Sequence, residues 1–153
     1  MPAPLRSFFA CLVFVSSIVA GMPASFAADR PWMGEQSRQA FVSDTNNART
    51  NHDRRVYQVS SRLTEVAQNW AEWMARHHRI QHNPNLETQV HNWQDLGENV
   101  GAGGSEPPIH RAFMNDTYHR DNILSPDYTQ IGIGTARDSE GRLYVDEVFR
   151  RPS

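Results

Sequence analysis

The strongest constraint on the fold is one long segment in which apolar residues recur at three- and four-residue steps. The segment follows Ser60 and Ser61, either of which can cap a helix, and it ends where Asn83-Pro84 enforces a stop. Its apolar positions are Leu63, Val66, Ala67, Trp70, Ala71 and Met74. This spacing predicts an amphipathic helix whose apolar stripe belongs to a core.

The C-terminal segment has the pattern of a β-hairpin. "QIGIGTAR" and "RLYVDEVF" favour strands, and "DSEG" between them is rich in turn residues. Upstream, residues 35–48 are weakly helical, and a further helix is predicted through "IHRAFMND" after two prolines. "GAGGSEPP" is predicted to be a flexible loop, and it lacks the spacing of a phosphate-binding loop. Helices followed by terminal strands predict an α+β layered domain.

The N-terminus has the pattern of a secretory signal peptide. Arg6 is the only charge before Asp29, the apolar run "SFFACLVFVSSIVAGM" follows it, and small residues precede a cleavage point near Ala27. The alternative is a retained membrane anchor, but the run falls short of the roughly 20 residues that a spanning helix needs. We therefore expect a secreted or envelope protein without a stable anchor after cleavage. Its predicted parts are a signal peptide over 1–27, a lead-in over 28–40 and one domain over 41–150.

Composition excludes several kinds of chemistry. Cys11 is the only cysteine and lies in the apolar run, so the mature domain has no disulfide and no thiol nucleophile. Lysine is absent, because all 15 basic residues are arginine, and this excludes Schiff-base chemistry. The net charge of −2 comes with no basic face, so we expect no nucleic-acid partner. The arginine usage and the disulfide-free design favour a bacterial source.

Two of the 7 histidines have neighbours that indicate chemistry. His82 stands where the long helix has just ended. Glu98 lies between apolar residues in "LGENV", where a buried carboxylate needs a partner. Asp116 and His119 are three residues apart and would share one side of a helix if the helix continues. The four groups fit either a divalent metal site or a hydrogen-bonded acid/base cluster, and spacing alone leaves both open.

The order of several short motifs resembles the CAP superfamily. The motifs are "LTEVAQNWAEWM", "QHNPN", "GENV", "FMND..HRDNIL", "IGIG" and "LYVDEVF", and together they cover about Phe41 to Phe149. That superfamily includes cysteine-rich secretory proteins, antigen 5 and the pathogenesis-related class one proteins. The likeness is greatest to its short bacterial secreted branch, which often lacks disulfides.

The resemblance implies a three-layer α-β-α sandwich that ends in an antiparallel hairpin, with a cleft lined by two histidines and two acids. Carried over by position, the cleft residues are His82, Glu98, Asp116 and His119. The two histidines are the implied ligands of a divalent metal, zinc first. Asp116 departs from the longer glutamate of many animal and plant members, and bacterial relatives often carry serine there. Phe113 stands where tryptophan is common.

The resemblance does not supply one shared reaction. The first hypothesis is a secreted ligand-binding module, not an enzyme, whose ligand is a small molecule, a lipid or a peptide. One alternative is a metal-dependent hydrolase of peptides or envelope material, with Glu98 and His119 as its catalytic residues. Neither "HExxH" nor "GxSxG" occurs, which disfavours that alternative. The other alternative is a lipid- or sterol-binding protein. Nothing in the sequence predicts an oligomeric state.

Overall fold

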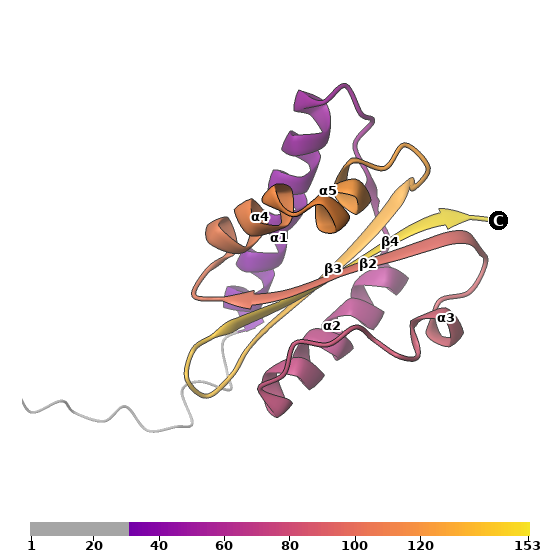
Figure 1. Cartoon of the computed structure of the whole chain (residues 1–153). Helices are drawn as coiled ribbons and strands as arrows, with labels where there is room; N and C mark the ends of the chain where they lie inside the picture. Colours follow the sequence, from indigo (N-terminus) through magenta and orange to yellow (C-terminus); the bar gives the residue numbers. More distant parts are fainter. Residues whose placement is uncertain (1–30) are drawn as a thin grey trace, which may run out of the picture.

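The structure, a computed structural model, describes residues 31–153 (Figure 1). The predicted signal peptide over 1–27 lies outside the described residues. The elements in chain order are α1 (Pro31–Asn51), β1 (Gln58–Val59), α2 (Ser61–His77), α3 (Leu86–Gln89), β2 (Trp93–Gly103), α4 (Glu106–Asn115), α5 (Thr117–Leu124), β3 (Gln130–Arg137) and β4 (Leu143–Pro152).

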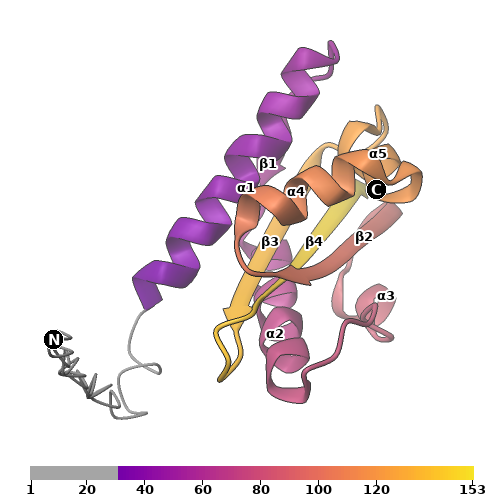
Figure 2. The same ribbon diagram turned by 60° about the vertical axis from the view of Figure 1, so that its left-hand side comes forward.

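The strands form one four-stranded sheet in the order β1-β3-β4-β2. β1 pairs with β3 in parallel, whereas β4 pairs antiparallel with both β3 and β2. The predicted C-terminal hairpin is therefore present as β3 and β4. β2 lies at one edge of the sheet, and Figure 2 shows it beside β4 with the hairpin in the middle.

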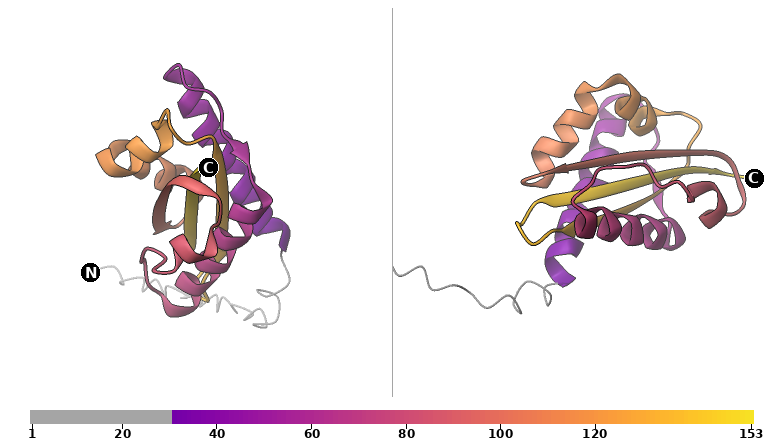
Figure 3. Two further views of the ribbon diagram at one scale, coloured as in Figure 1. Left: turned by 90° about the vertical axis from the view of Figure 1, so that its right-hand side faces the viewer. Right: turned by 60° about the horizontal axis from the view of Figure 1, so that its bottom comes forward.

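Helices cover both faces of the sheet, which gives the three layers of an α-β-α sandwich. α2 and the short α3 lie on one face, and α1, α4 and α5 lie on the other (Figure 3). The core on the α2 side includes Leu63, Val66, Ala67 and Val148. The core on the other side includes Phe41, Phe113, Ile131, Ile133 and Phe149. This arrangement confirms the α+β sandwich expected from the sequence.

α2 is the predicted amphipathic helix. Its N-cap is Ser60, whose side chain accepts a hydrogen bond from the backbone N–H of Leu63 at 3.4 Å. β3 approaches the helix closely because it has glycine at two facing positions. A Cβ atom added at Gly132 would lie 2.2 Å from the carbonyl carbon of Leu63, and one added at Gly134 would lie 2.2 Å from that of Ala67. The backbones of helix and strand are therefore in direct contact.

Three local predictions need correction. α1 begins at Pro31, four residues before the segment that the sequence pattern marked as helical. Residues 101–103 belong to strand β2 and not to a flexible loop. The glycines there serve close packing, because a Cβ atom at Gly101 would lie 2.8 Å from the ring of Phe113. The helix before Asp116 does not continue, since α4 ends at Asn115 and α5 begins at Thr117.

Among residues 31–153, none of the helices combines the length and the apolar character needed to cross a membrane.

Candidate functional site

His82 and Glu98 form the first histidine–carboxylate pair. His82 Nδ1 lies 2.5 Å from Glu98 Oε2. The backbone N–H of Asn83 donates to both carboxylate oxygens, at 3.2 Å and 3.1 Å. The Glu98 side chain is 5% exposed, whereas that of His82 is 66% exposed. A buried carboxylate therefore holds an imidazole that faces solvent through the rest of its ring.

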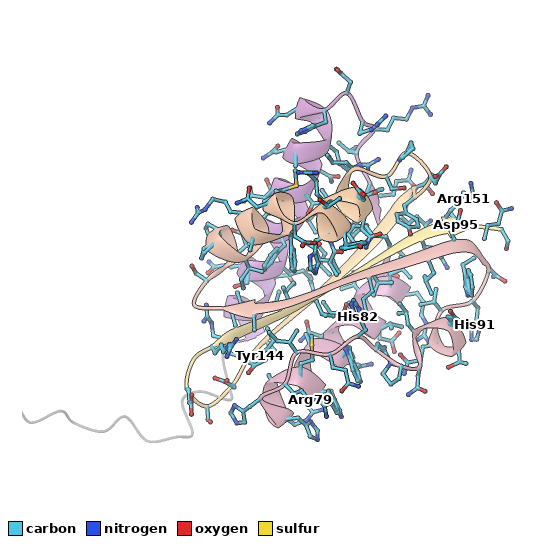
Figure 4. The ribbon with its side chains drawn as sticks, in the orientation of Figure 1. Arg79, His82, His91, Asp95, Tyr144 and Arg151 are labelled. Atoms are coloured by element: carbon cyan, nitrogen blue, oxygen red, sulfur yellow. The ribbon has the colours of Figure 1, made fainter. Side chains whose placement is uncertain are left out.

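The loop that carries His82 is anchored to the end of α2. The helix ends at His77, and its C-cap His78 adopts a left-handed conformation with φ of 50° that turns the chain back. Trp70 Nε1 donates to the carbonyl oxygen of Gln81 at 2.7 Å, and its ring stacks on that of Trp73 at 4.4 Å between centroids. His82 is thereby placed next to β2 on the side of α2 (Figure 4).

Asp116 and His119 form the second histidine–carboxylate pair. Asp116 is the N-cap of α5, and its Oδ1 accepts from the backbone N–H of His119 at 3.1 Å. The same oxygen lies 2.7 Å from His119 Nδ1. The imidazole stacks on Phe113 with 4.8 Å between ring centroids. A break between two helices, not one continuous helix, therefore brings this pair together.

Two consecutive residues of β2 connect the pairs, because their side chains point to opposite faces of the sheet. Glu98 holds His82 on the α2 face. Asn99 lies on the other face, where its Nδ2 donates to the carbonyl oxygen of His119 at 3.1 Å. Asn122 braces both, since its Nδ2 donates to Asn99 Oδ1 at 2.9 Å and to the carbonyl oxygen of Glu98 at 3.2 Å.

The four predicted site residues are thus organised as two pairs around one strand. Each histidine contacts one acid: His82 contacts Glu98, and His119 contacts Asp116. Within residues 31–153, no group of three or more histidine, cysteine, aspartate or glutamate side chains is arranged to hold a metal ion. Any metal bound here would therefore need ligands from water or from a bound molecule.

The acids of the two pairs have opposite electrostatic environments. Burial raises the pKa of Glu98, although the bonds from His82 and Asn83 oppose this shift. The pKa of Asp116 is lowered, first by the backbone N–H of His119 and then by the imidazole of the same residue. Asp116 is therefore the acid that stays ionised to lower pH, and Glu98 is the one whose charge is costly.

Sequence reasoning missed two buried acids in β4. Asp146 and Glu147 are both 0% exposed. Asp146 lies opposite Val100 and therefore shares the α2 face with Glu98; burial and the nearby Glu98 carboxyl raise its pKa well above its usual range. The signal that could have revealed them is a pair of consecutive acids inside the apolar strand "LYVDEVF", where charge is unexpected on either face.

Glu147 lies opposite Asn99 on the other face of the sheet. Asn99 Nδ2 donates to Glu147 Oε2 at 3.0 Å, whereas Glu147 Oε1 has no hydrogen-bond partner among the described residues. Burial raises the pKa of Glu147 to about 7. The side chain of Asn99 consequently hydrogen-bonds to Glu147, to Asn122 and to the backbone carbonyl of His119, a role that the sequence did not predict.

Comparison with known proteins supports the fold. The model of the family "CAP: Cysteine-rich secretory protein family" matches residues 42–148. A curated relative, the uncharacterized protein YkwD of Bacillus subtilis (strain 168), is 42% identical over 43 residues. That stretch is 28% of this chain and only 17% of the relative, so the likeness concerns one segment of a much longer protein.

Solved structures agree at low sequence identity, which shows the fold alone. An outer surface protein from Borrelia burgdorferi superposes with a TM-score of 0.72 and 13% identity, over 78% of this chain and 95% of that one. An extracellular protein with an SCP domain from Bacillus anthracis superposes with a TM-score of 0.68 and 21% identity, over 78% of this chain and 41% of that one. NaASP2, solved with Zn²⁺, superposes with a TM-score of 0.60 and 12% identity, over 75% of this chain and 79% of that one. Because the family model covers most of the described residues, the chain belongs to the cysteine-rich secretory protein (CAP) family.

Proposed function

We propose that this CAP domain acts outside the cytoplasm as a ligand-binding module, and that His82 and His119 hold a divalent cation, zinc first, at the free edge of β2. The observation that carries the proposal is shared by both pairs. In each, a carboxylate occupies Nδ1 of the imidazole and leaves Nε2 available. Histidines that bind metals typically have this arrangement, because the carboxylate fixes the tautomer and the ring orientation.

The donor chemistry fits zinc, which binds imidazole nitrogen readily. Glu98 and Asp116 would act behind the ligands, not as ligands, because each already engages a histidine. Two protein ligands leave coordination positions for water or for a bound molecule, as in sites that exchange ligands. When bound, the cation would supply an electrophilic contact for such a molecule.

The related structures support both parts of the proposal. Two of them are described as an outer surface protein and an extracellular protein, in agreement with export of this chain. The description of NaASP2 names Zn²⁺, so at least one protein with this fold has been solved with that ion.

The hydrolase alternative receives no support from the geometry. A general base needs a free carboxylate oxygen within reach of water. Both oxygens of Glu98 accept from the backbone N–H of Asn83, and one also contacts His82. Lipid binding is not favoured either, because within residues 34–153 the exposed large apolar side chains are only Val56, Val59, Ile80 and Tyr118.

Isothermal titration calorimetry with zinc chloride on the metal-free mature protein tests the proposal. We expect binding that disappears in the His82→Ala/His119→Ala variant and persists in His91→Ala, which removes an exposed histidine of the same chain. Absence of binding to the unmodified protein would contradict the metal assignment, as would equal binding by the double variant.

A further inference from the structure

The outer edge of β2 has no strand beside it. β2 stands last in the sheet order, and within residues 31–153 only β4 pairs with it. The strand runs for 11 residues, from Trp93 to Gly103, so the edge is long. Unpaired backbone N–H and C=O groups along such an edge form a template for another extended chain.

One contact shows which residues point their backbone groups outward. The carbonyl oxygen of Glu98 accepts from Asn122 Nδ2, a side chain outside the sheet, so it does not point toward β4. In an antiparallel pair, inward and outward backbone groups alternate along the strand. Val100 and Ala102 therefore share the outward direction of Glu98, whereas Gly101 points toward β4.

The same edge lies between the two histidine–carboxylate pairs. Glu98 holds His82 on one face, and Asn99 holds the backbone of His119 on the other. A chain laid along the edge would have one imidazole on each side.

We propose that the ligand of this site is an extended peptide that pairs its backbone with the outer edge of β2 at Val100 and Ala102. This inference rests on the proposed binding role of the edge, but not on the metal. Backbone donors and acceptors in alternation are matched by another polypeptide backbone, which is the basis of β-strand addition. A sterol or a small polar molecule would not satisfy such a row.

A single peptide suits the edge better than a second copy of this chain. Packing of Phe113 and Ile109 against Gly101 and Gly103 places α4 directly on one face of β2. On the other face, the loop that bears His82 reaches the strand through Glu98. A second folded copy would bring its own α4 and its own His82 loop against the α4 and the His82 loop of the first copy. An extended peptide has no such elements and would avoid this collision.

The probe is a phage-displayed library of random linear heptapeptides, selected on the purified full chain with a chelator present. The enriched peptide is then synthesised unmodified and with a single backbone N-methyl group at each position in turn. We expect methylation at alternate positions to weaken binding about tenfold, the loss of one backbone hydrogen bond, with little effect between them. Equal tolerance at every position, or no enrichment, would overturn the proposal.

Amide hydrogen exchange locates the peptide on the protein. Adding the peptide should slow exchange at Ala102 and leave Gly101 unchanged. Ala102→Pro removes the outward N–H at a position where an edge strand tolerates proline, and it should abolish binding, whereas Ala102→Ser should retain it. If Ala102→Pro does not fold, the methylated peptides and the exchange rates still decide. Slow exchange that depends on protein concentration without peptide would instead identify a second copy as the occupant.

The zinc titration separates this inference from the proposed metal site. Peptide binding that persists in His82→Ala/His119→Ala supports the peptide site at the edge of β2, and the cation site is then decided by calorimetry alone. Zinc binding without any peptide binding contradicts the peptide site and supports the cation site.

Discussion

The two faces of the sheet carry polar residues at matching positions but use them differently. On the α2 face, Glu98 of β2 lies diagonal to Asp146 of β4, so two carboxyl groups meet. On the other face, Asn99 lies opposite Glu147, so an amide meets a carboxyl. A strand that alternates faces thus places two acids together on one side and an amide with an acid on the other.

The difference determines how each histidine is held. His82 depends on a carboxylate whose own charge is costly, because that carboxylate is buried. The segment of His119 depends on a neutral amide that binds its backbone carbonyl. We therefore expect the Asn99 face to contribute to stability and the Glu98 face to set the properties of the site.

Removing the amide should have the largest effect. Asn99→Ala leaves the carbonyl oxygen of His119 and Oε2 of the buried Glu147 without this donor. It should lower the free energy of unfolding by about 3 kcal/mol, since each buried group left unpaired costs about 1–3 kcal/mol. Urea unfolding followed by circular dichroism measures it. Gln94→Ala, at an exposed position of the same strand, is the control and should change little.

Removing the acid on the opposite face should cost less. Glu98→Ala deprives the backbone N–H of Asn83 of its acceptor and leaves a small void, but it also removes a buried carboxyl. We expect a loss of about 2 kcal/mol in the same unfolding assay. A loss larger than that of Asn99→Ala would reverse the assignment of stability to the Asn99 face.

The stability of the chain should depend on pH through Glu147. Its pKa is about 7 in the folded state against an ordinary value of 4.5, so between these values only the folded chain retains the proton. Stability therefore falls as pH rises from about 4.5 to about 7 and levels off above that. Glu147→Gln keeps the acceptor for Asn99 and removes the titration, so it should raise stability at pH 8 by about 2 kcal/mol.

Unfolding midpoints of both proteins between pH 4 and pH 8 test this dependence. The variant should show a shallower decline, and the exposed substitution Glu87→Gln should leave the wild-type slope unchanged. Parallel slopes for Glu147→Gln and the wild type would mean that Glu147 is ionised throughout.

The smallest effect is expected at the exposed acid of the second pair. Asp116→Ala removes the N-cap of α5 and should lower the unfolding temperature slightly. Asp116→Asn preserves a good cap and should be nearly neutral, although it removes the charge beside His119. If the two substitutions destabilise equally, the charge and not the cap is what holds His119. Thermal unfolding at neutral pH distinguishes them.

The layers of the fold could be predicted because their signals are local. The stripe of α2 and the alternation of the β3–β4 hairpin each lie within one segment. The end of β2 could not be predicted, because a glycine-rich segment is typical of a loop. Only the contact between Phe113 and Gly101 explains why glycine is needed there. That contact depends on packing between segments distant in the sequence.

For the candidate site, the residue types were accessible but their partners were not. The histidines and acids have recognisable spacing, yet the expected continuous helix at Asp116 proved to be a break with a cap. Asn99 and Glu147 are 48 residues apart, and their hydrogen bond can be recognised only once the register of β2 on β4 is known. No pattern within either segment contains that information.

Gly132 and Gly134 have a consequence for variation. Because each faces the backbone of α2 at a distance that excludes a methyl group, any other residue would push the helix outward. That displacement would be carried along the helix to the loop that bears His82. In a saturation-mutagenesis screen scored by ligand binding, these two positions should therefore tolerate substitution as poorly as His82 and His119, although they lie on β3, away from the proposed ligand.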